Sequence, residues 1–217
     1  SSNFSFIMLF TAFKRHGFIT ALIVVISACN VPVKEKKKST TDASYNFALP
    51  KGWTEERIAF PIEFAPQINY IGVENLRFAP GWEFTTSEEH WAYAFLWWLD
   101  GKPALDKATL ESHLTSYYTG LVGRNIKQRR IPASEVVPVV VTLQKTVTQH
   151  GDVESYEGTG VITDYLDPNY EPITLNIKVH KKDCTHTSYI FQISPKPYNH
   201  RIWQQLNFLD QEFKCGN

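Results

Sequence analysis

Apolar and polar residues alternate in several short stretches of the chain, which is the spacing of half-buried β-strands. Turn-forming residues, mainly glycine, proline, asparagine and aspartate, separate many of these stretches. We therefore expect strands over residues 57–64, 69–78, 91–99, 139–147, 153–165, 173–179 and 189–193. Pro61 places the first of them at an edge of the sheet, because proline has no backbone N–H to donate to a neighbouring strand.

Two further stretches have the spacing of amphipathic helices, with apolar residues every three or four positions. The first covers residues 106–121, with Gly123 as its C-terminal cap, and the second covers residues 202–213, with Asn199 as its N-cap. The order is three strands, a helix, four strands and a helix. It predicts a single α+β domain, most simply an antiparallel sheet with both helices on its buried face.

A domain of this order that ends in an amphipathic helix carrying a tryptophan resembles the PsbP/Mog1-like sandwich. Members of that fold family are mostly small interaction or assembly modules. The resemblance therefore implies a binding role, and it assigns no individual residue.

The N-terminal part has the layout of an export signal, with a basic patch at residues 14–16 before an apolar stretch at residues 17–26. The sequence Ile-Ser-Ala-Cys at residues 26–29 resembles the lipobox of bacterial lipoproteins. The resemblance implies that the Cys29 thiol is acylated and that the chain is cut just before it. Residues 1–28 would then be a signal peptide, with an extension ahead of the single methionine.

The composition changes after Cys29. Residues 31–44 are rich in lysine, serine and threonine without apolar spacing, which is typical of a flexible tether. We expect a lipid-anchored tether over residues 29–44 and a globular domain over residues 45–217. In some lipoprotein families, acidic residues just after the acylated cysteine direct export to the cell exterior. Residues 30–34 of this chain include no acidic residue, so we expect a periplasm-facing position. The alternative is that residues 18–26 are an ordinary buried segment.

Composition and charge narrow the function classes. The 22 Lys and Arg residues balance the 22 Asp and Glu residues, so the chain lacks the basic excess of a nucleic-acid binder. No run approaches the roughly 20 apolar residues of a bilayer-spanning helix, which argues against a multispan membrane protein. The expected membrane contact is therefore the lipid anchor at Cys29, and no nucleic-acid partner is expected.

Beyond Cys29, the chain has two cysteines, Cys184 and Cys215. An even pair in an exported chain favours a disulfide, which would pin the C-terminus to the turn between the last two strands. Free thiols are one alternative. A metal site of His180, Cys184 and His186 is another, since thiolate and imidazole are zinc ligands, but the spacing matches no compact zinc pattern. We expect no metal and no cofactor.

The segment over residues 82–98 is unusually aromatic. In a strand Trp91, Tyr93 and Trp97 share one face, and Trp98 lies on the other. Such a strand belongs to the core, or part of the stripe lines a groove where the rings contact sugars, lipid tails or apolar side chains of a partner. These four residues are the candidate ligand-binding residues.

Glu88 and His90 are the candidate catalytic pair, since a carboxylate and an imidazole can act as acid and base. A solvated loop is the simpler interpretation. Asp164 and Asp167 similarly suit either Ca²⁺ or ordinary turn chemistry. The common local motifs of hydrolases, redox enzymes and nucleotide-binding proteins are missing from the sequence. We therefore expect a non-catalytic envelope lipoprotein that binds a protein, glycan or lipid-like ligand. The alternative is a small envelope hydrolase that uses Glu88 and His90, with a glycan as its candidate substrate.

Overall fold

The computed structural model describes residues 45–216. The expected signal peptide over residues 1–28, the acylated Cys29 and the tether over residues 29–44 lie outside the described residues. Within the described part, no helix is both long and apolar enough to cross a membrane.

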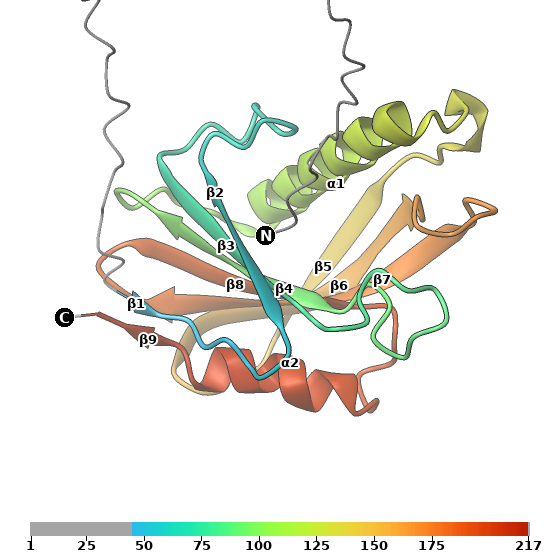
Figure 1. Ribbon diagram of the computed structural model, residues 1–217. Helices are drawn as coiled ribbons and strands as arrows, with labels where there is room; N and C mark the ends of the chain where they lie inside the picture. Colours follow the sequence, from blue (N-terminus) through green and yellow to red (C-terminus); the bar gives the residue numbers. More distant parts are fainter. Residues whose placement is uncertain (1–44, 217) are drawn as a thin grey trace, which may run out of the picture. The chain divides into compact units, whose positions relative to one another are not determined.

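The described chain is an α+β domain, as the pattern predicts (Figure 1). Its strands are β1 (Tyr45–Asn46), β2 (Thr54–Ala59), β3 (Gly72–Phe78), β4 (Tyr93–Leu99), β5 (Val140–Thr146), β6 (Asp152–Thr163), β7 (Pro172–Asp183), β8 (Thr187–Ser194) and β9 (Lys214–Cys215). Its helices are α1 (Lys107–Arg129), the short 3₁₀ turn η1 (Ala133–Glu135) and α2 (Ile202–Gln211). Seven strands form one antiparallel sheet in the order β2-β3-β4-β8-β7-β6-β5, and β1 pairs with β9.

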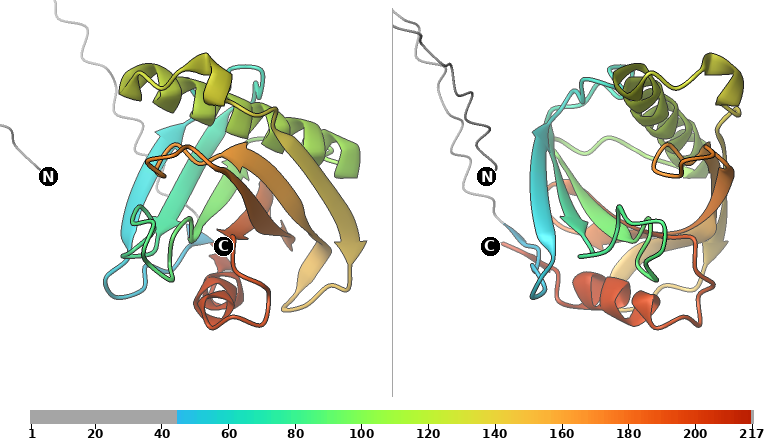
Figure 2. Two further views of the ribbon diagram at one scale, coloured as in Figure 1. Left: turned by 90° about the vertical axis from the view of Figure 1, so that its right-hand side faces the viewer. Right: turned by 45° about the vertical axis from the view of Figure 1, so that its right-hand side comes forward.

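The two helices cover opposite faces of this sheet, whereas the simplest expectation had both on one face (Figures 1 and 2). Trp91, Tyr93 and Trp97 belong to the apolar core under α1, and Leu96 and Trp98 belong to the core under α2. All seven residues of β4 are buried, because the strand is central and has a helix on each side. Because β4 has apolar residues on both of its faces, it packs against a separate core on each side of the sheet.

Helix α1 is longer than its strongest apolar spacing predicts. Gly123 lies inside the helix, and the C-terminal cap is Arg130, whose N–H bonds to the carbonyls of Ile126 and Lys127. Val122 and Ile126 continue the apolar stripe, so packing extends the helix past the glycine. Helix α2 has no side-chain cap from Asn199; its first residue instead bonds to His200 Nδ1.

The first main-sheet strand is an edge strand, as Pro61 predicts, but it runs over residues 54–59 and ends before the proline. Ile62 follows in a turn and is fully buried. It belongs to the core under α1, which is why its apolar character continued the alternating pattern beyond the strand.

The predicted pairing of Cys184 and Cys215 is present, with their Cα atoms 5.6 Å apart. The bond joins the β7–β8 turn to β9, and Cys215 is also paired in register with Tyr45 of β1. Both ends of the described chain are therefore fastened to the tip of the β7–β8 hairpin.

Candidate functional site

A cavity of about 220 Å³ lies between α1 and the face of the sheet formed by β2, β3 and β4. Its aromatic lining consists of Phe64, Phe78, Trp82, Trp91, Tyr93, Tyr117 and Tyr165, and its aliphatic lining of Ile58, Leu76, Leu121 and Leu166. A dry apolar cavity of about 150 Å³ is enough to bind benzene. The space therefore suits a group about the size of one aromatic ring.

The four predicted ligand-binding aromatic residues divide between this cavity and the two cores. Trp91 and Tyr93 line the cavity. Trp97 is fully buried beyond it, and its indole N–H donates to Glu74 Oε1 at 3.2 Å. Trp98 is on the opposite face and stacks on His186 at a ring distance of 4.5 Å. The aromatic stripe thus contributes half of its predicted residues to the cavity and half to packing.

Trp91 is held firmly in the cavity wall. Its backbone has a φ of 56°, in the left-handed region that non-glycine residues seldom adopt. Its indole N–H donates to Asp164 Oδ1 at 2.9 Å, and its ring meets Tyr165 edge-on. Asp164 also accepts from the backbone N–H of Leu166, so one carboxylate orders both sides of this wall.

The candidate pair Glu88 and His90 does not share a site. His90 is buried, and its Nε2 lies 2.7 Å from Asp164 Oδ2. Glu88 is exposed and pairs instead with His200 at 2.9 Å and Lys196 at 3.2 Å. Residues next but one on an extended strand share a face, but this loop is not a strand, and each side chain follows its own long-range partner.

The remaining metal hypotheses also change in the structure. Asp164 accepts from the N–H groups of Leu166 and Asp167, which is the turn chemistry that the sequence favoured. Burial by itself raises the pKa of Asp164, but the hydrogen bonds with His90 and Trp91 outweigh it and hold the pKa below its usual value. The proposed ligand Cys184 is in the disulfide.

Charged residues of both signs surround the cavity. Helix α1 contributes Arg124 and Arg129; β2 contributes Glu56, and the β3–β4 loop contributes Glu83. The Arg124 guanidinium lies 4.6 Å above the Phe64 ring, and the Arg129 guanidinium lies 5.6 Å from the Tyr165 ring. Sequence reasoning missed both arginines because it ended the helix at residue 121.

Glu74 is buried beside the cavity, behind Tyr117. Its carboxyl group has no exposure, and Oε2 has no hydrogen-bond partner among the described residues. Burial raises its pKa to about 8, although interactions with Trp97 and Tyr117 favour the charged form. Glu74 is therefore protonated in the folded protein at neutral pH.

We expect Glu74 to make the protein less stable as pH rises. Between its ordinary pKa of 4.5 and about 8, the folded state keeps a proton that the unfolded state has lost. The free energy of unfolding should thus fall through this window, by roughly 1 kcal/mol per pH unit, and level off above it. Urea unfolding at pH 5, 6.5 and 8 measures the slope. Glu74→Gln should flatten it, the exposed Glu63→Gln should not, and an equal slope in all three proteins would contradict the assignment.

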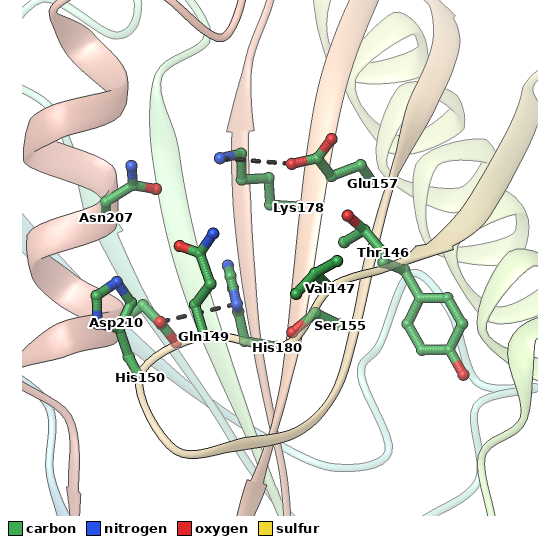
Figure 3. A pocket seen from close by; sticks show the side chains of 11 residues that line it. Thr146, Val147, Gln149, His150, Ser155, Glu157, Lys178, His180, Asn207 and Asp210 are labelled. Atoms are coloured by element: carbon green, nitrogen blue, oxygen red, sulfur yellow. Dashed lines mark ion pairs between the residues drawn. The ribbon is translucent and has the colours of Figure 1, made fainter.

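A second charged cluster lies on the other face of the sheet, between β6, β7 and α2. Lys182 Nζ is 2.5 Å from Asp152 Oδ1 and 2.6 Å from Asp210 Oδ1. His180 Nδ1 is 2.7 Å from Asp152 Oδ2. Both aspartate side chains are at most 2% exposed. Figure 3 shows His180 and Asp210 facing one another. Both residues line a cavity of about 50 Å³.

This cluster has side chains of metal-ligand type, but both of its carboxylates already contact a cation of the protein, Lys182. Asp152, His180 and Asp210 hold ligand atoms within 4.8 Å of one another. The Lys182 ammonium lies against both carboxylates, where a bound cation would also have to lie. Burial by itself raises the pKa of Asp152, but its hydrogen bonds with His180 and Lys182 hold it below the usual value. The cluster therefore links α2 to β6 and β7 through buried ion pairs.

Comparison with known proteins identifies no relative of this chain. No family model matches the chain, and no significant match was found to a curated protein or to a solved structure. The aromatic cavity and the charges around it are therefore the features that indicate a function.

Proposed function

We propose that this protein is a non-catalytic binding module whose ligand places an apolar group in the aromatic cavity under α1. The observation that carries the proposal is the cavity itself: about 220 Å³ lined mainly by rings and branched aliphatic side chains. A concave site with mainly apolar lining and a few polar groups at its edge is the usual form of a small-ligand site in proteins.

The catalytic alternative has less support. A hydrolase that uses Glu88 and His90 requires the two side chains to approach one substrate, and they bind different partners. His90 and Asp164 form a buried pair, but the groups bonded to them are an indole and backbone amides. We favour a positional role for His90, which fixes the carboxylate that holds Trp91.

The proposed setting is the bacterial cell envelope, with the domain anchored through a lipid on Cys29. The lipobox-like sequence at residues 26–29 and the polar stretch after it support this setting. The disulfide of Cys184 and Cys215 agrees with an oxidising compartment. Detection of an acylated Cys29 by mass spectrometry of membrane fractions would test the anchor separately from ligand binding.

We expect Leu121→Trp to abolish binding in the cavity while leaving the fold intact. Leu121 lines the cavity from α1 and is only partly buried, so the larger ring would occupy the space at little cost to the core. Toluene is a suitable probe, measured by ¹H–¹⁵N shifts of residues around the cavity.

The matched control for this experiment is Ile126→Trp. Ile126 is on the same helix and is also half-buried, but it lines the groove towards η1 instead. Toluene should bind the wild-type protein and Ile126→Trp alike. Equal binding to Leu121→Trp, or no binding to the wild-type protein, would overturn the proposed site.

A further inference from the structure

We propose that the ligand of this cavity is a small zwitterion with one apolar group, the chemistry of a hydrophobic α-amino acid. The inference rests on the proposed function and adds the charge of the ligand to it. It follows from the size of the cavity and from how charges of opposite sign are divided between the elements around it.

The positive charges come from one element. Arg124 and Arg129 both project from α1, and each guanidinium lies over a ring that lines the cavity, Phe64 or Tyr165. Both arginines are close enough to the cavity wall for their positive charge to act on Tyr165, whose pKa they act to lower. Stacking on the cavity rings keeps these charges at the mouth instead of leaving them free to extend into solvent.

The negative charges come from the opposing elements. Glu56 projects from β2 on the same face as Ile58, which lines the cavity, and Glu83 comes from the β3–β4 loop. Glu56 and Arg124 act in opposite directions on the pKa of Glu74, so both charges are close to the buried side of the cavity.

These four charges are not paired with one another. Among the described residues, none of the four forms an ion pair within 4.0 Å. Glu55, the neighbour of Glu56 on β2, is paired, with Arg77 at 3.2 Å. The cavity therefore has two positively charged side chains on the α1 side and two negatively charged side chains on the opposing side. All four are available to bind a ligand.

Only a ligand with both charges uses this arrangement fully. Glu56 and Glu83 would repel a simple carboxylate, and the two arginines would repel a simple amine. A neutral hydrocarbon would shield four charged groups from water without replacing their partners. In a hydrophobic amino acid the carboxylate can face α1, the ammonium group can face β2 and the loop, and the side chain can enter the aromatic space.

Four probes of nearly equal shape separate these possibilities: L-phenylalanine, 3-phenylpropionate, phenethylamine and ethylbenzene. We expect phenylalanine to bind the full-length protein about tenfold more tightly than phenylpropionate or phenethylamine, since one hydrogen-bonded charge contributes about that factor, and about a hundredfold more tightly than ethylbenzene, which lacks both charges. Titrations followed by ¹H–¹⁵N shifts suit the weak affinities of such small molecules.

Charge-removing variants assign each end of the ligand. Arg124→Gln should weaken the binding of phenylalanine and phenylpropionate about tenfold and leave the binding of phenethylamine unchanged. Glu56→Gln should weaken the binding of phenethylamine and leave the binding of phenylpropionate unchanged. Lys127→Gln on α1 and Glu63→Gln are the controls, because both residues are exposed and lie outside the cavity lining.

The outcomes separate this inference from the proposed function. Equal binding of all four probes, or tightest binding of phenylpropionate, phenethylamine or ethylbenzene, overturns the zwitterion but keeps the cavity as a binding site. Loss of phenylalanine binding in Lys127→Gln to the same degree as in Arg124→Gln also overturns it. If none of the four probes shifts the cavity residues, both the inference and the proposed function fail.

Discussion

Lys182→Met is expected to lower the free energy of unfolding by about 3–5 kcal/mol. The substitution leaves Asp152 and Asp210 buried and facing each other without the ammonium that lies within 2.6 Å of both. Burial already raises the pKa of Asp210 with the lysine in place, so removal of the positive charge should force protonation or local opening. Urea unfolding at pH 7, followed by circular dichroism, measures the loss.

A double variant shows whether the loss comes from the unpaired charge. Lys182→Met combined with Asp210→Leu removes both partners, and Asp152 keeps its bonds with His180 and Ser155. Most of the stability should return, since replacing a buried ion pair with apolar residues is often close to neutral. Lys145→Met, at an exposed position on β5, should change stability by less than about 0.5 kcal/mol. A Lys182→Met effect as small as that of Lys145→Met would mean that the cluster contributes no stability.

Loss of the disulfide is expected to destabilise the domain by about 3–4 kcal/mol, from the entropy of the chain that the bond closes. The sequence separation of Cys184 and Cys215 is 31 residues. The β1–β9 pair has only two residues in each strand, so without the bond little else holds the C-terminus to the β7–β8 turn. We therefore expect β9 to detach first.

The measurement is urea unfolding of the oxidised protein and of the Cys184→Ser/Cys215→Ser variant. Dithiothreitol should lower the midpoint of the wild-type protein to that of the variant and leave the variant unchanged. Hydrogen exchange should report faster exchange of the β1 and β9 amides in the variant than of the central strand β4. If the two proteins have the same midpoint, the bond contributes no net stability.

The zwitterion proposal gives the two faces of the domain different roles. The face under α1 holds a cavity with unpaired charges around it, and the face under α2 holds charges that are already paired. Variants at Lys182 and at the disulfide should accordingly change stability without changing the ranking of the four probes. Variants at Arg124 and Glu56 should change the ranking with little effect on stability, because both residues are exposed.

The sequence by itself determined the elements of this protein. Apolar spacing and turn residues predicted a strand overlapping each of the seven strands of the main sheet, and helical spacing predicted both helices, because most elements have to present an apolar face to a core. The first strand was predicted at 57–64 and forms over 54–59, and the two-residue strands β1 and β9 were not predicted. The pairing of Cys184 with Cys215 was also predictable, since the described domain has no other cysteine. Such features depend on residues close in sequence or on simple counting.

Only the tertiary structure decided the site. His90 and Asp164 are 74 positions apart, and Lys182 meets Asp210 across the space between a strand and a helix. The placement of α1 and α2 on opposite faces separates Trp91 from Trp98, although the two lie in one aromatic segment. Contacts of this kind depend on which sheet face each helix covers, and the period of one chain segment carries no information about that choice.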